Sequence, residues 1–249
     1  MSLLSPQDIH RLRGVIAAAD EEARIQRVTL DGAVYWVKRE EKLSLRWRLQ
    51  KGDGARALER ERTAYHELGG RELPIAELVD EGPDYLVTRS AGAPLSVLLA
   101  DPDTDAAAKS TMLVAAAEAL HRLHAVGVAH GRPSPRDMMW DGAQVTFIDF
   151  ERFGKTRNLG RARAVDVILF AFGCLDILGA PDPAIDAGLA RYRALDTGGA
   201  WDRAVRLLSR LRWIAPLALR IPGLRDGRDI RTGAMVFDAI LRDGAARAA

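Results

Sequence analysis

Two short segments of this 249-residue chain carry most of the side chains that could do chemistry. The first begins at His130 and ends at Asp137, with Arg132 between them, and the second has Asp149 after an apolar run. Carboxylates are hard oxygen ligands of the kind that Mg²⁺ prefers, and an arginine pairs readily with an anion. Asp149 could hold a metal in such an arrangement, or it could merely cap a turn.

Lys38 is a further residue that could do chemistry, and it lies at the end of a predicted strand. Residues 24–30 and 33–38 flank Asp31-Gly32, which is a two-residue hairpin signal. Residues 55–68 contain no Gly or Pro and have apolar side chains at near-helical spacing, so they predict a helix. Lys38 and an acid on this helix could form an ordinary surface pair, worth under about 1 kcal/mol, or a phosphate site.

The remaining elements follow from turn signals and periodicity. Residues 106–126 predict a long helix whose apolar face consists of Leu113, Ala116, Ala117, Leu120, Leu123 and His124. Strands are expected at residues 75–79, 85–88, 137–140 and 144–149, and helices from residue 161 onward, with Pro181, Pro183, Pro216 and Pro222 as interruptions. These elements predict an α+β chain with a small β-rich lobe and one helix in residues 1–90. A connector near residues 90–94 leads into a mainly helical lobe, with a hairpin, in residues 91–249.

Composition excludes several classes of protein. With 48% hydrophobic and 28% charged residues, the chain is neither disordered nor fibrous. Its single cysteine, Cys174, cannot form an internal disulfide, which favours a reducing compartment. The first ten residues lack a secretory signal, and Asp166 and Asp176 interrupt the longest apolar stretch, so we expect a cytoplasmic protein that does not span a membrane.

In motif order and spacing the chain resembles the protein-kinase-like superfamily. That family's catalytic loop runs His, any residue, Asp, four residues and Asn, and a second Asp follows about a dozen residues later. His130, Asp137 and Asp149 fall at the first, last and later positions. The amino acids at residues 36–39, 80–84, 130–131 and 148–151 are more similar to the motifs of bacterial lipopolysaccharide-core kinases, including the Kdo kinase group, than to those of eukaryotic protein kinases. The resemblance implies a bilobal protein-kinase-like fold.

The resemblance also implies a role for each matching residue. Asp149 and Asp137 would hold Mg²⁺, and Lys38 would contact the phosphates of ATP. Glu61 would pair with Lys38, with Glu59 as the alternative in another helix register. His130 would be a buried structural histidine that orders the loop, and Asp166 would brace the loop backbone. ATP and Mg²⁺ are the expected cofactors if the site functions, and none is expected otherwise.

The sequence departs from the family's pattern at three places. Arg132 stands where the family has the Asp that accepts the proton of the attacking hydroxyl, and an arginine cannot act as that base. It could be a simple loss, or an anion-binding residue that pairs with Asp149 or Asp137 in place of Mg²⁺. Trp36, on the same strand face as Lys38, could close the adenine slot or form a stacking surface. No Gly-rich loop precedes Lys38.

These departures leave three functional hypotheses open. The first is a pseudokinase, or a strongly weakened phosphotransferase, with a binding or regulatory role. The second is an active ATP- and Mg²⁺-dependent phosphotransferase that acts on a lipopolysaccharide-core sugar or another small hydroxyl acceptor without a dedicated base. The third is a nucleotide-independent adaptor at a membrane surface.

Two basic segments that contain tryptophan, residues 42–51 and 207–225, bear on the third hypothesis. Such segments can lie on anionic membranes, which would place the protein at the inner membrane. Alternatively, Trp47 and Trp213 pack within the fold while the arginines face water. The expected partners are therefore nucleotide, a protein or an anionic membrane surface. No motif for nucleic acid is present.

Overall fold

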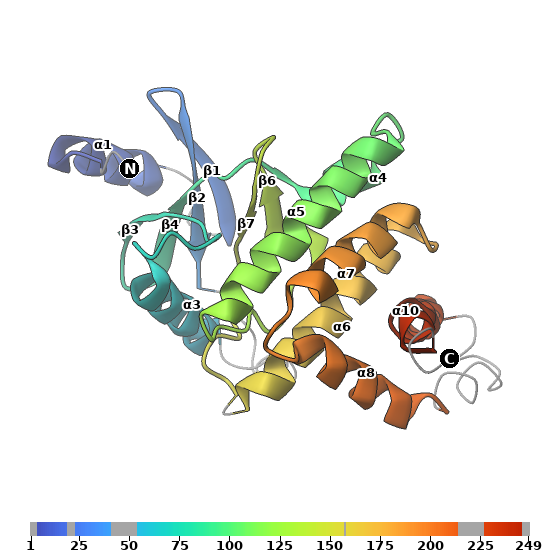
Figure 1. Cartoon of the computed structure of the whole chain (residues 1–249). Coiled ribbons are helices and arrows are strands. Elements are labelled where there is room, and N and C mark those ends of the chain that lie inside the picture. The colour runs from blue at the N-terminus through green and yellow to red at the C-terminus, as the bar shows by residue number, and fades with distance from the viewer. Residues whose placement is uncertain (1–3, 19–22, 41–53, 157, 214–226, 246–249) are drawn as a thin grey trace. The chain divides into compact units, whose positions relative to one another are not determined.

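The chain divides into two compact units. The computed structural model describes residues 4–18, 23–40, 54–156, 158–213 and 227–245 (Figure 1). One unit comprises Met1–Ala91 together with Asp149–Gly154, and the other comprises Gly92–Ile148 together with Lys155–Ala249. Residues 149–154 thus form a return segment, in which the chain comes back to the first unit and brings Asp149 into it.

The first unit is built on a four-stranded antiparallel sheet with the strand order β1-β2-β4-β3. Its strands are β1 (Ile25–Leu30), β2 (Ala33–Arg39), β3 (Leu78–Glu81) and β4 (Tyr85–Arg89). Asp31 and Gly32 connect β1 to β2 with φ values of 50° and 79°, the left-handed geometry that matches the twist of a hairpin. The predicted hairpin is therefore confirmed. Strand β3 starts three residues later than predicted, and its register shifts between Leu78 and Asp80.

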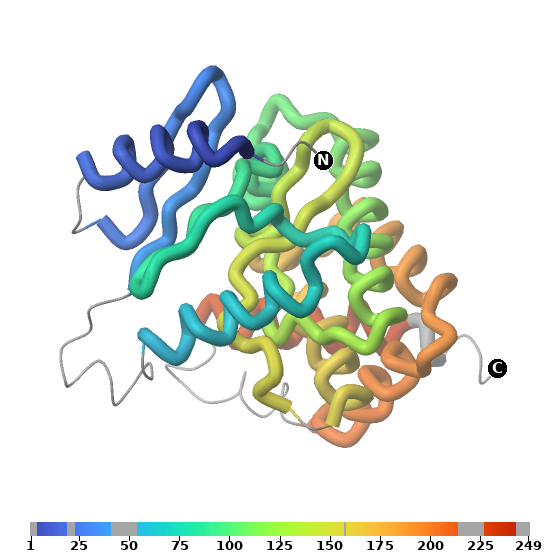
Figure 2. Tube along the Cα trace, turned by 90° about the vertical axis from the view of Figure 1, so that its left-hand side faces the viewer, coloured from blue at the N-terminus to red at the C-terminus, as the bar shows by residue number. Residues whose placement is uncertain are grey.

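An amino-terminal helix that the sequence analysis did not predict covers one face of this sheet. Helix α1 (Pro6–Ala17) is the dark blue helix at the amino-terminal end of the trace in Figure 2. It begins with a capping box between Ser5 and Asp8. Its buried Leu12 and Ile16 belong to the same apolar cluster as Tyr35 and Val37 of β2. Because side chains alternate along a strand, Trp36 and Lys38 point to the opposite face.

Helix α3 (Gly54–Leu68) is the one predicted for residues 55–68. Leu58, Ala64, Tyr65 and Leu68 are buried along one side of it. That side also contains Glu61, which is only 3% exposed. A charged residue is rarely so buried unless it has a partner, so this helix delivers a carboxylate to an interior position.

The second unit contains a small sheet of order β5-β6-β7, and the remainder of its described elements are helical. The strands are β5 (Ala93–Pro94), β6 (Met138–Trp140) and β7 (Val145–Phe147), with β6 and β7 antiparallel after the short helix η1 (Pro135–Asp137). The helices are α4 (Leu95–Ala100), α5 (Ala106–Ala125), α6 (Leu159–Leu178), α7 (Pro183–Leu195), α8 (Ala200–Leu211) and α10 (Arg228–Ala245).

Helices α5 and α7 lie side by side in this unit (Figure 1). All six residues predicted for the apolar face of α5 are buried. The two helices approach closely at Gly188 of α7, where an added Cβ would lie 2.9 Å from the backbone oxygen of Leu113. In the described residues the predicted α+β class is confirmed, with a small β-rich amino-terminal part and a mainly helical remainder.

Two sequence features bear on the membrane hypothesis. No helix in the described ranges is long and apolar enough to cross a membrane. Trp213 is 60% exposed, so it is not part of the buried core of the described residues. Residues 42–51, with Trp47, lie outside the described residues, as do Pro216, Pro222 and most of the second basic segment.

Candidate functional site

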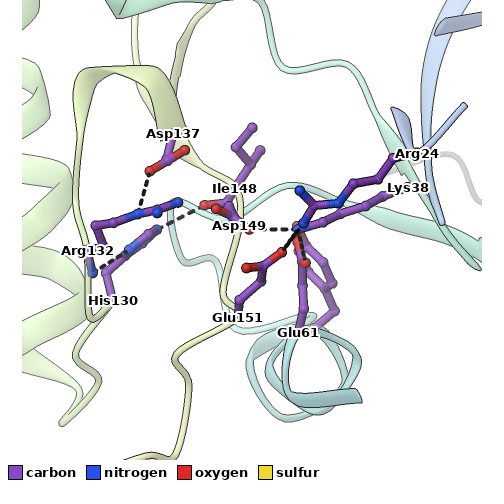
Figure 3. A network of polar contacts seen from close by, with 10 residues as sticks. Arg24, Lys38, Glu61, His130, Arg132, Asp137, Ile148, Asp149 and Glu151 are labelled. Carbon is purple, nitrogen blue, oxygen red and sulfur yellow. Dashed lines mark hydrogen bonds and ion pairs between the residues drawn. The ribbon is translucent and has the colours of Figure 1, made fainter. Parts of the chain in front are cut away.

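Lys38 lies at the centre of a cluster of carboxylates in the first unit (Figure 3). Its Nζ is 2.5 Å from Glu61 Oε2, 2.6 Å from Asp149 Oδ1 and 2.9 Å from Glu151 Oε1. Strand β2 supplies Lys38, helix α3 supplies Glu61, and the return segment of residues 149–154 supplies both acids that follow β7. Three separate stretches of sequence thus meet at one ammonium group.

Glu61 is the most deeply buried member of this cluster. Its second oxygen, Oε1, accepts a hydrogen bond of 3.2 Å from the Tyr65 hydroxyl one helical turn away. Burial raises the pKa of Glu61, while the positive charge of Lys38 lowers it and the charges of Asp149 and Glu151 raise it again. The pKa of Glu61 is thus raised overall by its burial, and the adjacent Lys38 ammonium is the group that favours its charged form.

Lys38 is correspondingly held in its charged form. Burial by itself would lower the pKa of Lys38, but Glu61, Asp149 and Glu151 together raise it above its usual range. The ammonium is consequently a permanent cation at neutral pH. Such a group can bind phosphate as a point charge, which is the role that the sequence predicts for it.

Asp149 adopts a backbone conformation that few residues share. Its φ is 68°, in the left-handed region where aspartate and asparagine are among the few non-glycine residues tolerated. Phe150 beside it is fully buried and its ring packs edge-on against the ring of Tyr65, 6.1 Å between centroids. The anchored Phe150 and the strained turn hold the Asp149 carboxylate toward Lys38.

Glu151 and Arg24 are members of this cluster that the sequence analysis did not select. Arg24 Nη2 donates to Glu151 Oε1 over 2.6 Å, so this one carboxylate oxygen bridges Arg24 and Lys38. The available signal was the tripeptide Asp149-Phe150-Glu151, in which a glutamate stands where the family's Asp-Phe-Gly has a glycine. For Arg24, which precedes β1, the sequence offered no signal.

In the second unit, Asp166 of α6 binds the backbone before η1. Asp166 is fully buried and accepts hydrogen bonds from the backbone N–H groups of His130, at 2.7 Å, and Gly131, at 2.9 Å. His124 Nε2 is 3.2 Å from the same carboxylate. Gly131 has a φ of 93°, which a residue with a side chain would adopt only with strain, so the loop turns sharply immediately after His130.

His130 is itself buried and directs its ring toward the strand that leads to Asp149. It is 1% exposed, and its Nε2 donates to the backbone carbonyl of Ile148 over 2.9 Å. The Ile148 N–H in turn donates to the backbone oxygen of Asp137 at 3.0 Å. These bonds tie the two motif segments together by their backbones.

Arg132 lies at the loop position that the resemblance assigns to a catalytic base. Its Nε lies 3.8 Å from Asp137 Oδ2, and its side chain is 52% exposed against 13% for Asp137 (Figure 3). The guanidinium thus pairs with the carboxylate that the resemblance assigns to metal binding. Of the two anions that the sequence analysis considered for Arg132, this contact is with Asp137.

Trp36 is a partly exposed ring on the Lys38 face of the sheet. It is 39% exposed, and its Nε1 donates to Ser90 Oγ over 3.4 Å. The ring is pinned near the end of β4 rather than buried in the core. An exposed indole of this kind can serve as a stacking surface for an aromatic base.

The predicted site residues thus fall into two groups. Lys38, Glu61, Asp149 and Trp36 belong to the first unit, whereas His130, Arg132, Asp137 and Asp166 belong to the second. The side chain of Glu59, the alternative partner of Lys38, is instead 67% exposed, and its Oε2 lies 3.4 Å from Nε of Arg62. The joint binding of one metal by Asp149 and Asp137 stays a prediction.

Comparisons with known proteins give two similarities. No family model matches the chain. The chain is 27% identical over 198 residues to an uncharacterized protein of Haemophilus influenzae, which covers 80% of this chain and 82% of that relative. Among solved structures it is similar to the gentamicin–APH(2")-IIa complex, with a TM-score of 0.49 and 12% identity, over 95% of this chain and 97% of the other.

Proposed function

We propose that this chain is a pseudokinase: a kinase-fold protein that retains a phosphate site at Lys38 while phosphoryl transfer is lost or strongly weakened. The observation that carries the proposal is Arg132, which stands in the position of the catalytic base and pairs with Asp137 at 3.8 Å. A guanidinium does not give up its proton in a protein, so it cannot accept one from a substrate hydroxyl. The protein would then act by binding nucleotide and a partner.

The retained half of the site supports nucleotide binding. The buried pair of Lys38 and Glu61, at 2.5 Å, fixes the ammonium on the face of the sheet that carries Trp36. The Asp149 carboxylate offers oxygens of the kind that suit Mg²⁺. When bound, the metal would neutralise phosphate charge.

A second candidate function is an active phosphotransferase. The intact Lys38–Glu61 pair favours it, because phosphoryl transfer depends mainly on positioning and charge neutralisation. The acceptor would be a hydroxyl of a lipopolysaccharide-core sugar or of another small molecule, as the resemblance of the sequence motifs implies. Arg132 would then bind acceptor or phosphate anion instead of acting on a proton.

The first experiment is a calorimetric titration of the full chain with ATP, with and without Mg²⁺. We expect weak binding that is lost in Lys38→Ala, because that substitution removes the point charge for phosphate. The absence of binding at millimolar ATP in the wild type would contradict a nucleotide-binding pseudokinase unless the site is blocked from within.

A back-substitution then separates the two candidate functions. If Arg132 is what prevents transfer, Arg132→Asp should gain ATP turnover, on the order of 100-fold, because a positioned general base typically contributes that much or more. Arg136→Asp makes the same charge change at a 66% exposed position of the same loop and should gain nothing. Robust transfer by the wild type that disappears in Asp149→Asn would instead establish an active enzyme.

A further inference from the structure

Three carboxylate oxygens surround the Lys38 ammonium. Nζ donates hydrogen bonds to Glu61 and Asp149, and Oε1 of Glu151 lies 2.9 Å from it as an ion pair. A phosphate oxygen that approaches Nζ must therefore take the place of one of these carboxylates. The three acids differ in how easily they can leave.

Glu61 is the most costly of the three to move. It is 3% exposed and also accepts from Tyr65, so its departure from Lys38 would leave a charge buried in the helix interface. Asp149 is 17% exposed and fixed by a left-handed backbone next to buried Phe150. Neither can leave Lys38 without rearrangement of its own element.

Glu151 can leave with the least loss. It makes the longest of the three contacts, it is the most exposed at 26%, and it already has a second cationic partner in Arg24. Arg24 is 40% exposed and lies 2.6 Å from the same Glu151 oxygen. Glu151 can therefore give up Lys38 and keep Arg24.

We propose that Glu151 sets the nucleotide affinity of this unit by competing with phosphate for Lys38. The proposal rests on the nucleotide binding proposed above. In the unliganded protein Glu151 bridges Lys38 and Arg24, and a bound phosphate oxygen replaces Glu151 on Lys38 while Arg24 retains it. Glu151 is thus a specificity-determining residue, because only an anion that outcompetes a tethered carboxylate occupies the site.

The charges of the cluster support the same conclusion. Three carboxylates face two basic side chains in these contacts, which leaves one negative charge in excess among the five residues. An incoming polyphosphate adds further negative charge close to Glu151. Replacement of Glu151 by an uncharged residue of the same shape would remove both the competitor and the repulsion.

The test is a calorimetric titration of Glu151→Gln in the full chain, with MgATP and, separately, with tripolyphosphate, which has no base to contact Trp36. We expect both ligands to bind about tenfold more tightly than to the wild type, equivalent to about 1.4 kcal/mol. Glu59→Gln removes the same charge from a 67% exposed position of α3 and should leave both affinities unchanged. Thermal unfolding of each variant checks that it is folded. If Glu151→Gln does not fold, Glu151→Gly takes its place in the same titrations.

A double-mutant cycle tests the role of Arg24. Arg24→Ala should weaken binding in the wild-type background, because Glu151 loses its alternative partner. It should weaken binding much less in the Glu151→Gln background. Equal effects in the two backgrounds would show that Arg24 acts on phosphate directly and would overturn the exchange of partners.

The remaining outcomes separate this proposal from the function on which it rests. Affinities of Glu151→Gln equal to or weaker than those of a wild type that binds would overturn the role of Glu151 and leave the proposed function intact. Binding by Glu151→Gln together with no binding by the wild type would support both, with Glu151 as the internal block. No binding by the wild type or by any folded variant would overturn both.

Discussion

Asp166 is the residue on which the geometry of the His130 loop depends. Its two oxygens accept from two successive backbone N–H groups, those of buried His130 and of partly buried Gly131. A buried donor that loses its acceptor costs the desolvation free energy of that donor, about 1–3 kcal/mol. Asp166 thus matters to the loop whether or not the loop catalyses anything.

We therefore expect Asp166→Ala to lower the free energy of unfolding by about 2–4 kcal/mol, since it removes the acceptor of the buried His130 N–H and of the partly buried Gly131 N–H. Urea denaturation followed by circular dichroism measures the loss. Asp103→Ala, at an exposed loop position, is the control and should stay within about 0.5 kcal/mol of the wild type. Equal stability of the two variants would show that water replaces the carboxylate.

At the residue scale, the sequence could indicate the burial of Glu61 but not the contacts of Glu151. Glu61 precedes Ala64, Tyr65 and Leu68 at helical spacing, and this spacing places it on the buried face of α3. Glu151 lies beyond the predicted strand of residues 144–149, and its contacts depend on a left-handed turn at Asp149 and on a salt bridge to a residue 127 positions away. Neither of these can be deduced from local pattern.

At the scale of elements, helix α1 shows where periodicity is too weak a signal. Leu12 and Ile16 are the buried residues of α1, and most of its other residues are polar or small. Ser5, Pro6 and Asp8 form a complete helix-start signal, which depends on capping chemistry rather than on an apolar face. Strand β3 likewise lacks a simple apolar alternation, because its buried Asp80 pairs with Arg13 of α1.

The packing of α5 against α7 gives a prediction at this scale. An alanine Cβ at position 188 would lie 2.9 Å from the backbone oxygen of Leu113, so the two helices would have to separate. We expect Gly188→Ala to lower the free energy of unfolding by about 1–3 kcal/mol, despite the better helix propensity of alanine.

Gly233→Ala in α10 is the matched control for this prediction. Position 233 is also within a helix, but an added Cβ there meets nothing within 4 Å. It should therefore raise the free energy of unfolding by up to about 1 kcal/mol. Thermal melts of both variants should shift in opposite directions, and a Gly188→Ala variant as stable as Gly233→Ala would contradict the close approach.

At the scale of the whole molecule, the chain's one cysteine gives a probe of unfolding. Cys174 of α6 is fully buried, and its burial raises the pKa of the thiol well above its usual range. The thiolate, which is the reactive form, is therefore nearly absent from the folded protein at neutral pH, whereas the thiol of the unfolded chain ionises at its ordinary pKa.

We expect a thiol reagent at neutral pH to label Cys174 only through unfolding of the second unit. The labelling rate should rise with urea in parallel with the loss of helical circular dichroism. Raising the pH from 7 to 9 should accelerate labelling of the unfolded chain much more than it increases direct reaction of the folded one. Rapid labelling of the native protein without denaturant would show that α6 opens locally.

The order of elements along the whole chain was the most predictable property. Hairpin, helix, strands, long helix, second hairpin and carboxy-terminal helices each have a local signal such as Asp31-Gly32 or the apolar face of α5. The assignment of residues 149–154 to the first unit has no local signal, because it depends on contacts with Lys38 and Arg24 that are distant in sequence.

This return segment affects how the gene can be divided. A fragment that stopped at Ala91 would contain Lys38 and Glu61 but would lack Asp149 and Glu151, two of the three acids that surround the lysine. Neither unit is therefore a module that recombination could transfer intact as one uninterrupted stretch of DNA. The Lys38 cluster must be inherited with the whole chain, because its acids come from two parts of the sequence, Glu61 from α3 and Asp149 and Glu151 from the return segment.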